Sequence, residues 1–583
     1  MGSTYIPQGT TTRLMPADED ASSQSAQGNR EQQAFHEWPN EAGFDGLTEH
    51  RGPIELKVKG NIPAWAAGSL YRTGPGACKV EDTKSGTFYI SHWVDGLAHT
   101  HRFDIVAEGA GAEPTVRVYY SSRRQSDKVT ADIKAAGMLR SMSFAQKLDP
   151  CIGLFGKFMT AFNKRPHTAL GNVGVTVGVN VPSFKTLNKA AVDAQGHRAK
   201  GHHAANIVIG TDAAVLCEIH PKTMEPISFP KQSRKFHPDL KGPLAAAHGK
   251  LDQETGDYFN YNLELGKQPI YRVFRVNAAT GKTDILAAIP YKAAYIHSFF
   301  MTHNYIILCI PVAYYEWNGL KILWEGNLHD AFKPFDPSET CRWFIVDRRY
   351  RKGVVAEFVS PARFFFHTVN AFEDDHGDVF YEVVDYPNRY ILDGLYYDVI
   401  LDRNGKATEY WRDGQLAHQS FPRLTRYHLR KKEFFTGSAA AASAAPAPES
   451  VMEVPAPHAG EMPVINPQYR CRKHRYGYFL ISRALSTLFD AIAKVDTDTR
   501  ELLQWEGPRG HSPGEAIFVP RPAAAEGEVP DEDDGVLLSV VLDGANRTSY
   551  LLCLDAKTMT ELGSAECEFA VAIGLHGRHV PAS

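Results

Sequence analysis

The sequence predicts an all-β fold, a barrel or a propeller, over most of its 583 residues. Short runs of β-forming residues recur along the chain, and polar turn sequences separate them. Examples of these turns are Ala-Thr-Gly-Lys at 279–282 and Asp-Arg-Asn-Gly at 402–405. The clearest predicted strands are 258–263, 270–276, 305–310, 342–346, 379–384, 476–481 and 536–542. Many short strands are typical of barrels and propellers, but no repeated motif fixes the number of blades.

Two compositionally biased tracts interrupt this pattern. Residues 1–45 are rich in polar residues and glycine, and we expect a disordered tail because little apolar surface is available to offset the entropy of ordering. Residues 437–460 are rich in alanine and proline, and the prolines forbid a continuous helix. We interpret this second tract as a surface insertion within one domain that spans 46–583.

Composition excludes several classes of protein. The 63 lysine and arginine residues nearly balance the 67 aspartate and glutamate residues, so a nucleic-acid partner is not expected. The eight cysteines contain no Cys-x-x-Cys pair, which argues against a disulfide framework or a thiolate metal site. The sequence shows neither a signal peptide nor an apolar run of roughly 18 residues that could span a membrane. A reduced, cytoplasmic protein is the simplest expectation.

One segment departs from the β pattern. Residues 131–163 are expected to be helical, and they interleave methionine, leucine and phenylalanine with lysine and arginine. An ordinary core helix is one interpretation. The other is an interfacial patch, in which apolar side chains enter a bilayer and lysines meet the headgroups.

Four histidines lie in distinctive contexts far apart in the chain. They are His248 in A-A-A-H-G-K-L-D, His297 in A-Y-I-H-S-F-F, His367 in F-F-F-H-T-V-N and His576 in I-G-L-H-G-R. Their separation rules out a local metal finger, so a shared site requires a large closed fold that brings distant strands to one axis. Imidazole ligands suit iron, zinc, copper or nickel.

These contexts and several other motifs resemble the carotenoid cleavage oxygenase family. The resemblance extends from about residue 52 to the C-terminus and includes G-N-I-P-A-W-A-A-G-S-L-Y-R-T-G-P-G at 60–76, H-W-V-D-G-L-A-H-T-H-R-F-D at 92–104, D-P-C-I-G-L-F at 149–155 and E-A-I-F-V-P-R-P at 515–522. It implies a seven-bladed β-propeller with a helical and loop cap over an axial metal site. In that family four histidines hold one Fe(II) per chain, which here implies His248, His297, His367 and His576.

The resemblance also implies three glutamates that hydrogen-bond the ligand histidines. Metal-bound histidines usually donate their second ring N–H to a carboxylate or a carbonyl. The matching positions are Glu218 in V-L-C-E-I-H-P, Glu461 in E-M-P-V-I-N-P and Glu515 in G-E-A-I-F-V-P, with Glu453 as a rival for Glu461. The pairing of each glutamate with a histidine stays open.

The implied reaction is oxidative cleavage of one C=C bond of a carotenoid or apocarotenoid polyene by O2, giving aldehydes such as apocarotenals or retinal. In overall character the sequence most resembles fungal enzymes that cleave torulene or β-carotene. Such a substrate is dissolved in membranes, which favours the interfacial interpretation of 131–163 and points to Leu154, Phe155 and Phe158 as the contact with membranes or lipid bodies. Phenylalanines beside the ligands, Phe299, Phe300, Phe364, Phe365 and Phe366, are candidates for the tunnel wall.

Three alternatives remain open at this stage. One is a stilbene-cleaving oxygenase, and the second is an isomerohydrolase that uses the same iron site without O2. The third is a binding propeller in which the metal is only a structural pin. No protein partner can be inferred from the sequence.

Overall fold

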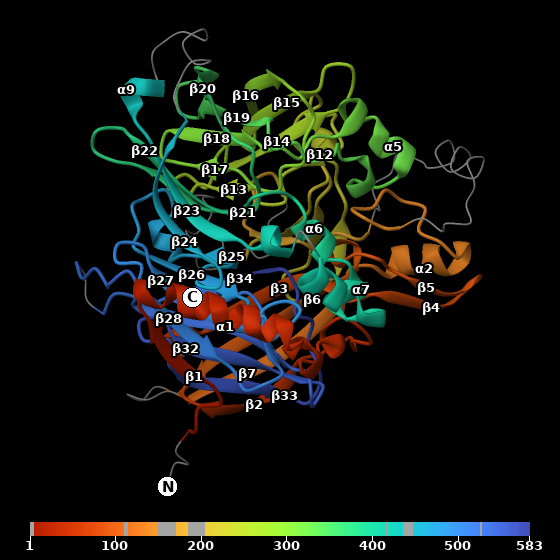
Figure 1. The fold of residues 1–583 in the computed structure, drawn as a ribbon, viewed down its shortest axis with the longest axis vertical. Helices are drawn as coiled ribbons and strands as arrows, with labels where there is room; N and C mark the ends of the chain where they lie inside the picture. The colour runs from red at the N-terminus through yellow and green to blue at the C-terminus, as the bar shows by residue number, and fades with distance from the viewer. Residues whose placement is uncertain are drawn as a thin grey trace.

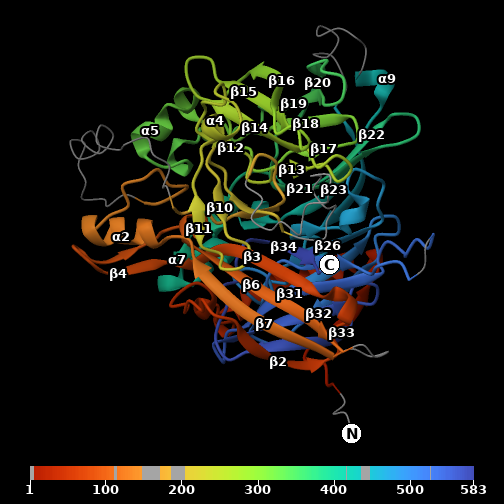
Figure 2. The same cartoon turned by 180° about the vertical axis from the view of Figure 1, so that it is seen from behind.

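The computed structural model describes residues 5–109, 115–147, 171–184, 204–414, 417–434, 447–524 and 527–582. Antiparallel strands dominate these residues, so the prediction of a mostly β fold is confirmed (Figures 1 and 2). Each predicted strand lies within or overlaps an observed strand. The apolar run of β31 (Gly535–Asp543) is buried along nearly its whole length, which is the pattern expected of a strand covered on both faces.

Five sheets have four or five strands each. The first contains β8 (Thr176–Val179), β9 (Ile207–Gly210), β10 (Cys217–Ile219) and β11 (Pro226–Ser228). The second contains β12 (Leu244–Ala245), β13 (Lys250–Leu251), β14 (Tyr258–Glu264), β15 (Ile270–Val276) and β16 (Thr283–Pro290). The third contains β17 (Phe300–Met301), β18 (Tyr305–Ile310), β19 (Thr340–Asp347) and β20 (Val354–Pro361). The fourth contains β21 (Phe364–Glu373), β22 (Val379–Tyr386), β23 (Arg423–Leu429) and β24 (Glu449–Pro455). The fifth contains β25 (Glu461–Val464), β26 (Tyr476–Ile481), β27 (Ala491–Asp496), β28 (Leu502–Glu506) and β1 (Thr10–Leu14).

The remaining large sheet has ten strands and joins the two ends of the chain. Its members are β2 (Ile54–Gly60), β3 (Gly68–Ala77), β6 (Leu97–Glu108), β7 (Thr115–Arg124), β29 (His511–Pro513), β30 (Ile517–Pro520), β31 (Gly535–Asp543), β32 (Thr548–Asp555), β33 (Glu561–Cys567) and β34 (His576–Pro581). A separate ribbon pairs β4 (Lys79–Thr83) with β5 (Gly86–Tyr89). The observed strand pairing therefore does not by itself divide the fold into seven separate blades.

Helices are few, and most are short. They are α1 (Glu19–Glu31), α2 (Asp127–Ala136), α4 (Gln232–Lys235), α5 (Lys321–Glu325), α6 (Ile391–Gly394), α7 (Tyr397–Ile400), α8 (Lys406–Thr408) and α9 (Lys431–Phe434). A five-residue π-helix, η10 (Glu409–Asp413), follows α8 directly. Among the described residues no helix is long and apolar enough to cross a membrane.

Strand order explains how distant parts of the chain can meet. In the second to fifth sheets an early strand, β12, β17, β21 or β25, lies at one edge, and β34 lies at an edge of the ten-stranded sheet. The four candidate histidines and Glu461 lie in or next to these edge strands, whereas Glu218 lies in β10, an inner strand of the first sheet. The ten-stranded sheet also carries β30, which follows Glu515.

The expectation of a disordered tail over 1–45 is wrong for the residues that the structure describes. β1 pairs along its whole length with β28, and α1 lies beside the C-terminal strands in Figure 1. Phe35, Trp38 and Phe44 are buried, and the indole of Trp38 donates to Ser512 Oγ at 2.8 Å. Three aromatic side chains supply the apolar surface that the polar average composition of this segment conceals.

The predicted insertion is also shorter than its expected bounds of 437–460. Residues 435–446 lie outside the described part, but 449–455 form β24, the edge strand that pairs with β23. Val454 and Ala459 are almost fully buried. The second half of the tract is therefore part of the sheet, because proline is compatible with an edge strand even though it forbids a helix.

The predicted helix over 131–163 ends early. α2 stops at Ala136, and Gly137 follows with a φ of 72°, the left-handed conformation that commonly terminates helices. Phe144 then packs in the core against His92 and Tyr295. Residues 148–163, including Leu154, Phe155 and Phe158, lie outside the described residues.

Candidate metal centre

Four histidine side chains converge on one point. His248 lies in the turn between β12 and β13, His297 precedes β17, His367 lies in β21 and His576 begins β34. One ring nitrogen from each lies within 4.8 Å of the others. The Nε2 atoms of His248 and His297 are 3.1 Å apart, and so are those of His367 and His576. The structure thus brings together all four histidines that the sequence singles out.

The protonation state of these rings suits metal binding. Burial lowers the pKa of His367 to about 4, against a smaller opposing effect of Glu461. Burial and then the neighbouring imidazoles hold the pKa of His248 well below its usual value. In a neutral imidazole whose Nδ1–H is donated to a carboxylate, as in His367, Nε2 carries the lone pair, and here that atom faces the common point. Converging lone pairs with no proton between them fit a divalent transition metal, and imidazole suits iron, zinc, copper or nickel.

Glu461 accepts a hydrogen bond from His367. Its Oε2 lies 2.5 Å from His367 Nδ1, and Tyr386 donates its hydroxyl to Oε1 at 2.6 Å. Burial alone would raise the pKa of Glu461, but His367, Tyr386 and the Met462 N–H together hold it below its usual value. The rival Glu453 lies on β24 and pairs with Arg423 instead.

Glu515 has the corresponding position beside His576. Its Oε1 lies 2.8 Å from His576 Nδ1, and the Gly577 N–H donates to Oε2 at 2.7 Å. Arg72, which is fully buried, lies 3.8 Å from Oε2 and donates to the Glu515 backbone carbonyl at 2.7 Å. Arg72 lies in the motif at 60–76, which is one of the motifs behind the family resemblance. The sequence alone did not indicate its contact with Glu515.

The third carboxylate is Asp212 and not Glu218. His297 Nδ1 lies 2.9 Å from Asp212 Oδ1, and Tyr295 donates its hydroxyl to Oδ2 at 3.0 Å. Glu218 is buried on β10, where it accepts a hydrogen bond from Ser228 Oγ at 2.8 Å. Asp212 lies six residues before Glu218, in the loop between β9 and β10, and the sequence pattern, which specifies a glutamate, did not indicate it.

His248 differs from the other three histidines. Its backbone N–H donates weakly to the His297 carbonyl at 3.4 Å. Within the described part of the chain, no carboxylate lies within hydrogen-bonding distance of its ring. Three of the four imidazoles are therefore oriented by a carboxylate, and the fourth by packing against its partners.

A largely apolar cavity opens beside the histidines. Its lining includes His297, His367 and His576 together with aromatic and aliphatic side chains such as Phe366, Tyr386 and Leu575. Of the five phenylalanines that the sequence offered as tunnel wall, Phe366 lies in this lining. The other four, Phe299, Phe300, Phe364 and Phe365, are buried in the hydrophobic core and are not in the lining of this cavity.

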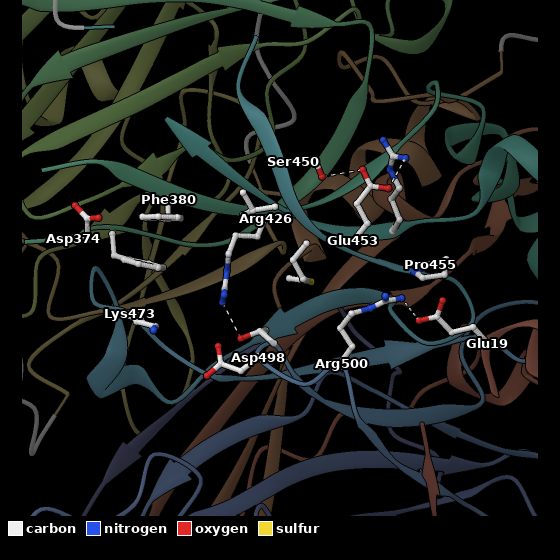
Figure 3. A pocket seen from close by; sticks show the side chains of 15 residues that line it. Glu19, Asp374, Phe380, Arg426, Ser450, Glu453, Pro455, Lys473, Asp498 and Arg500 are labelled. Carbon is white, nitrogen blue, oxygen red and sulfur yellow. Dashed lines mark hydrogen bonds and ion pairs between the residues drawn. The ribbon is translucent and has the colours of Figure 1, made fainter. Parts of the chain in front are cut away.

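A second cavity lies between the fourth and fifth sheets and is of a different kind. Its lining contains many charged side chains, and two pairs of them form ion pairs there, Arg500 with Glu19 (Figure 3) and Arg423 with Glu453. Arg426 donates to Thr497 at 2.8 Å across the gap. None of the four clustered histidines is in its lining, so the apolar cavity is the one that serves the metal centre.

Fold and site together define a β protein in which four clustered histidines, a group that could hold a metal ion, lie beside an apolar cavity. The sequence profile of the family described as retinal pigment epithelial membrane protein matches residues 43–581. The protein therefore belongs to this family, that of the carotenoid oxygenases.

Similar proteins agree with this assignment. The chain is 47% identical to a carotenoid dioxygenase of Neurospora crassa, over 99% of this chain and 96% of that protein. It is 45% identical to a torulene dioxygenase of Fusarium fujikuroi, over 94% of this chain and 95% of that protein. A solved variant of Synechocystis apocarotenoid oxygenase superposes with a TM-score of 0.68 at 20% identity, covering 94% of this chain and 98% of the other. This last similarity concerns the fold alone.

Proposed function

We propose that this protein is an Fe(II)-dependent dioxygenase that cleaves one C=C bond of a carotenoid or apocarotenoid polyene. The main observation behind this proposal is the cluster of four imidazoles, three of which line an apolar cavity. The relatives at 45–47% identity, a carotenoid dioxygenase and a torulene dioxygenase, support the choice of reaction. In this reaction both atoms of O2 enter the products and each forms one carbonyl group, so no reductant is needed.

The side chains have separate roles in this proposal. His248, His297, His367 and His576 would hold the iron, and Asp212, Glu461 and Glu515 would orient three of them. When bound, iron would supply the activation of O2. The apolar lining would exclude water and align the conjugated chain beside the centre, so that the shape of the cavity selects the scissile bond.

A seven-bladed propeller accounts for the sheet pattern. The ten-stranded sheet divides at β2, which pairs with β33 on one side and β7 on the other. One half, β34-β3-β6-β7, and the other, built on β29 to β33, would be two blades beside the five smaller sheets. The similarity to a solved apocarotenoid oxygenase supports this division.

We also propose peripheral contact with membranes or lipid bodies through the segment that contains Leu154, Phe155 and Phe158. The argument rests on the sequence, because apolar side chains interleaved with lysines suit an interface. A polyene substrate would be extracted from that phase. In this proposal the protein is otherwise cytoplasmic.

The strongest alternative is an isomerohydrolase-like reaction at the same centre, which would consume no O2. Purified protein loaded with iron should consume O2 and release aldehydes from a carotenoid panel, identified by chromatography. His367→Ala should lose iron and activity while staying folded. Products without O2 consumption would establish the alternative, whereas cleavage of stilbenes but not carotenoids would correct the substrate class.

A further inference from the structure

The apolar cavity also reaches the N-terminal segment. Arg30, in the last turn of α1, lies in its lining together with Phe35. Arg30 is the single lysine or arginine among the described lining residues, which otherwise are mainly apolar. A guanidinium in such a wall calls for an explanation, because a buried charge is costly unless something pairs with it.

Within the described chain nothing accepts a hydrogen bond from this guanidinium. Its carbon lies 4.2 Å from the centroid of the Phe421 ring, which gives a cation–π contact but no acceptor. Its N–H groups are oriented in a planar fork that suits carboxylate or carbonyl oxygens. Arg30 is half-buried, and burial lowers its pKa against a smaller opposing effect of the neighbouring Glu31 carboxylate, which gives a Coulombic attraction but no hydrogen bond.

A second donor without a partner lies in the same wall. The indole Nε1 of Trp411 is buried, and it has no acceptor in the described part of the structure. The Trp411 ring lies nearly parallel to Phe421, with centroids 6.1 Å apart and an interplanar angle of 8°. Trp411 belongs to the π-helix η10, which packs against α1, and π-helical turns occur frequently at functional sites.

Arg30 and Trp411 therefore contact the same phenylalanine, line the same cavity and both lack an acceptor. The buried Trp411 N–H without an acceptor costs stability, and a ligand oxygen that also accepts from the half-buried Arg30 guanidinium can remove that cost. We propose that this pair binds an oxygen-bearing end group, a carboxylate or an aldehyde, of the polyene substrate. The inference rests on the proposed function and adds the substrate class: a polyene oxidised at one end.

The proposal has a consequence for the cleaved bond. When the end of a rigid conjugated chain is fixed at Arg30 and Trp411, the double bond beside the histidines lies at a fixed number of carbons from the anchored oxygen. A hydrocarbon polyene would lack this reference point. The pair would thus determine both which substrate binds and where it is cut.

Binding of three matched probes to the iron-loaded protein under anaerobic conditions tests this assignment. The probes are an apocarotenoid carboxylate, the corresponding aldehyde and a methyl-terminated hydrocarbon with the same conjugated chain, and binding is followed by quenching of tryptophan fluorescence. The carboxylate should bind about 10-fold or more tightly than the hydrocarbon, the scale of hydrogen bonds to a charged group. Arg30→Met should abolish this preference while leaving hydrocarbon affinity unchanged.

Two further variants separate the contributions. Trp411→Phe keeps the ring but removes the N–H, so it should reduce the preference by a smaller factor. Arg13→Met removes an exposed arginine on β1 outside the cavity lining and should change nothing. In aerobic turnover, Arg30→Met should give a mixture of cleavage positions from the carboxylate where the wild type gives one.

Equal affinity of the wild type for all three probes, or a preference that survives Arg30→Met, would overturn the inference. Cleavage of the hydrocarbon would in that case leave the proposed dioxygenase function standing. If the iron-loaded protein cleaves no polyene at all, the proposed function and this inference both fail. Melting curves of each variant show whether lost preference comes from lost folding, and Arg30→Lys should keep part of the preference because it keeps the charge.

Discussion

Asp212 accepts the Nδ1 proton of His297 at 2.9 Å from a loop between two strands, and the Tyr295 hydroxyl holds the other carboxylate oxygen. The same arrangement occurs at His367, where Glu461 and Tyr386 have these positions. A side chain one methylene shorter thus performs the same task when the backbone approaches more closely. Asp212 therefore contacts the histidine cluster directly, whereas Glu218 contacts Ser228 and none of the four histidines.

Replacing Asp212 should weaken metal binding. We expect Asp212→Asn to lower iron affinity by about 10–100-fold, the usual scale for a group that hydrogen-bonds a ligand histidine. Glu218→Gln is the matched control, because its carboxylate is buried but contacts Ser228, and it should leave iron affinity unchanged. Titration of the metal-free variants with Fe(II) under anaerobic conditions checks both. The opposite pattern would restore Glu218 to the site.

Arg72 and Glu515 should be energetically coupled. Arg72→Met would leave the buried Glu515 carboxylate with a weaker set of partners, and breaking a buried ion pair typically costs about 3–5 kcal/mol. Since the two groups are 3.8 Å apart, we expect a cost at the lower end of that range. The double variant Arg72→Met with Glu515→Gln should recover part of the loss. Denaturant unfolding of the four metal-free proteins measures the coupling, and strictly additive losses would contradict it.

The sequence could predict the four clustered histidines but not the side chains that hydrogen-bond and orient them. The four histidines lie in contexts long enough to identify one by one, and the edge-strand positions bring them together. Asp212 and Arg72 act through contacts that join residues far apart in the chain, so no local pattern distinguishes them. The number of blades stays ambiguous for a related reason, since β2 pairs on both sides and merges two sheets.

The error at the N-terminus has a physical cause as well. β1 is polar and has little apolar surface to bury, but its three threonines suit a strand and β28 offers an unpaired edge that it completes. Average composition over 45 residues also conceals the buried aromatic residues. Disorder is therefore a poor inference where a short polar segment can pair with an existing sheet.

Deletion of residues 1–14 should consequently destabilise the protein. Glu561 is mostly buried and accepts hydrogen bonds from the Tyr5 hydroxyl and from the Gln8 and Gly9 N–H groups. Without them it retains the Trp505 indole N–H, at 3.0 Å. A buried group that loses such partners costs about 1–3 kcal/mol, and the exposed β28 edge should promote aggregation. Adding Glu561→Gln to the deletion should restore part of the melting temperature, and an unchanged melting temperature in the deletion alone would count against this account.

Acid should destabilise the metal-free protein below about pH 6.5. Burial lowers the pKa of His92 and of His99 to about 3, so both rings stay neutral in the folded state while the unfolded chain takes up protons. In the unfolded chain both histidines have the ordinary pKa of 6.5, so between pH 6.5 and about 3 the unfolded state binds more protons than the folded state. Stability therefore rises with pH across that window and is lost as pH falls toward 3. Each histidine contributes on the order of a few kcal/mol. His99→Gln should flatten the dependence of melting temperature on pH, and an unaltered slope would show that other groups control acid unfolding.

The proposed membrane contact yields the last prediction. Replacing Leu154, Phe155 and Phe158 together with serine should release the protein from liposomes, because each change removes apolar surface that would enter the bilayer. Turnover of bilayer-embedded carotenoid should slow, whereas detergent-dispersed substrate should be cleaved at close to the wild-type rate, since the iron site is untouched. Met138→Ser, at an exposed position near the start of the 131–163 segment and just after α2, provides the matched control and should leave liposome binding intact. If the triple variant unfolds, the three side chains are core residues and the docking proposal fails. If it folds and still sediments with liposomes, another surface makes the contact.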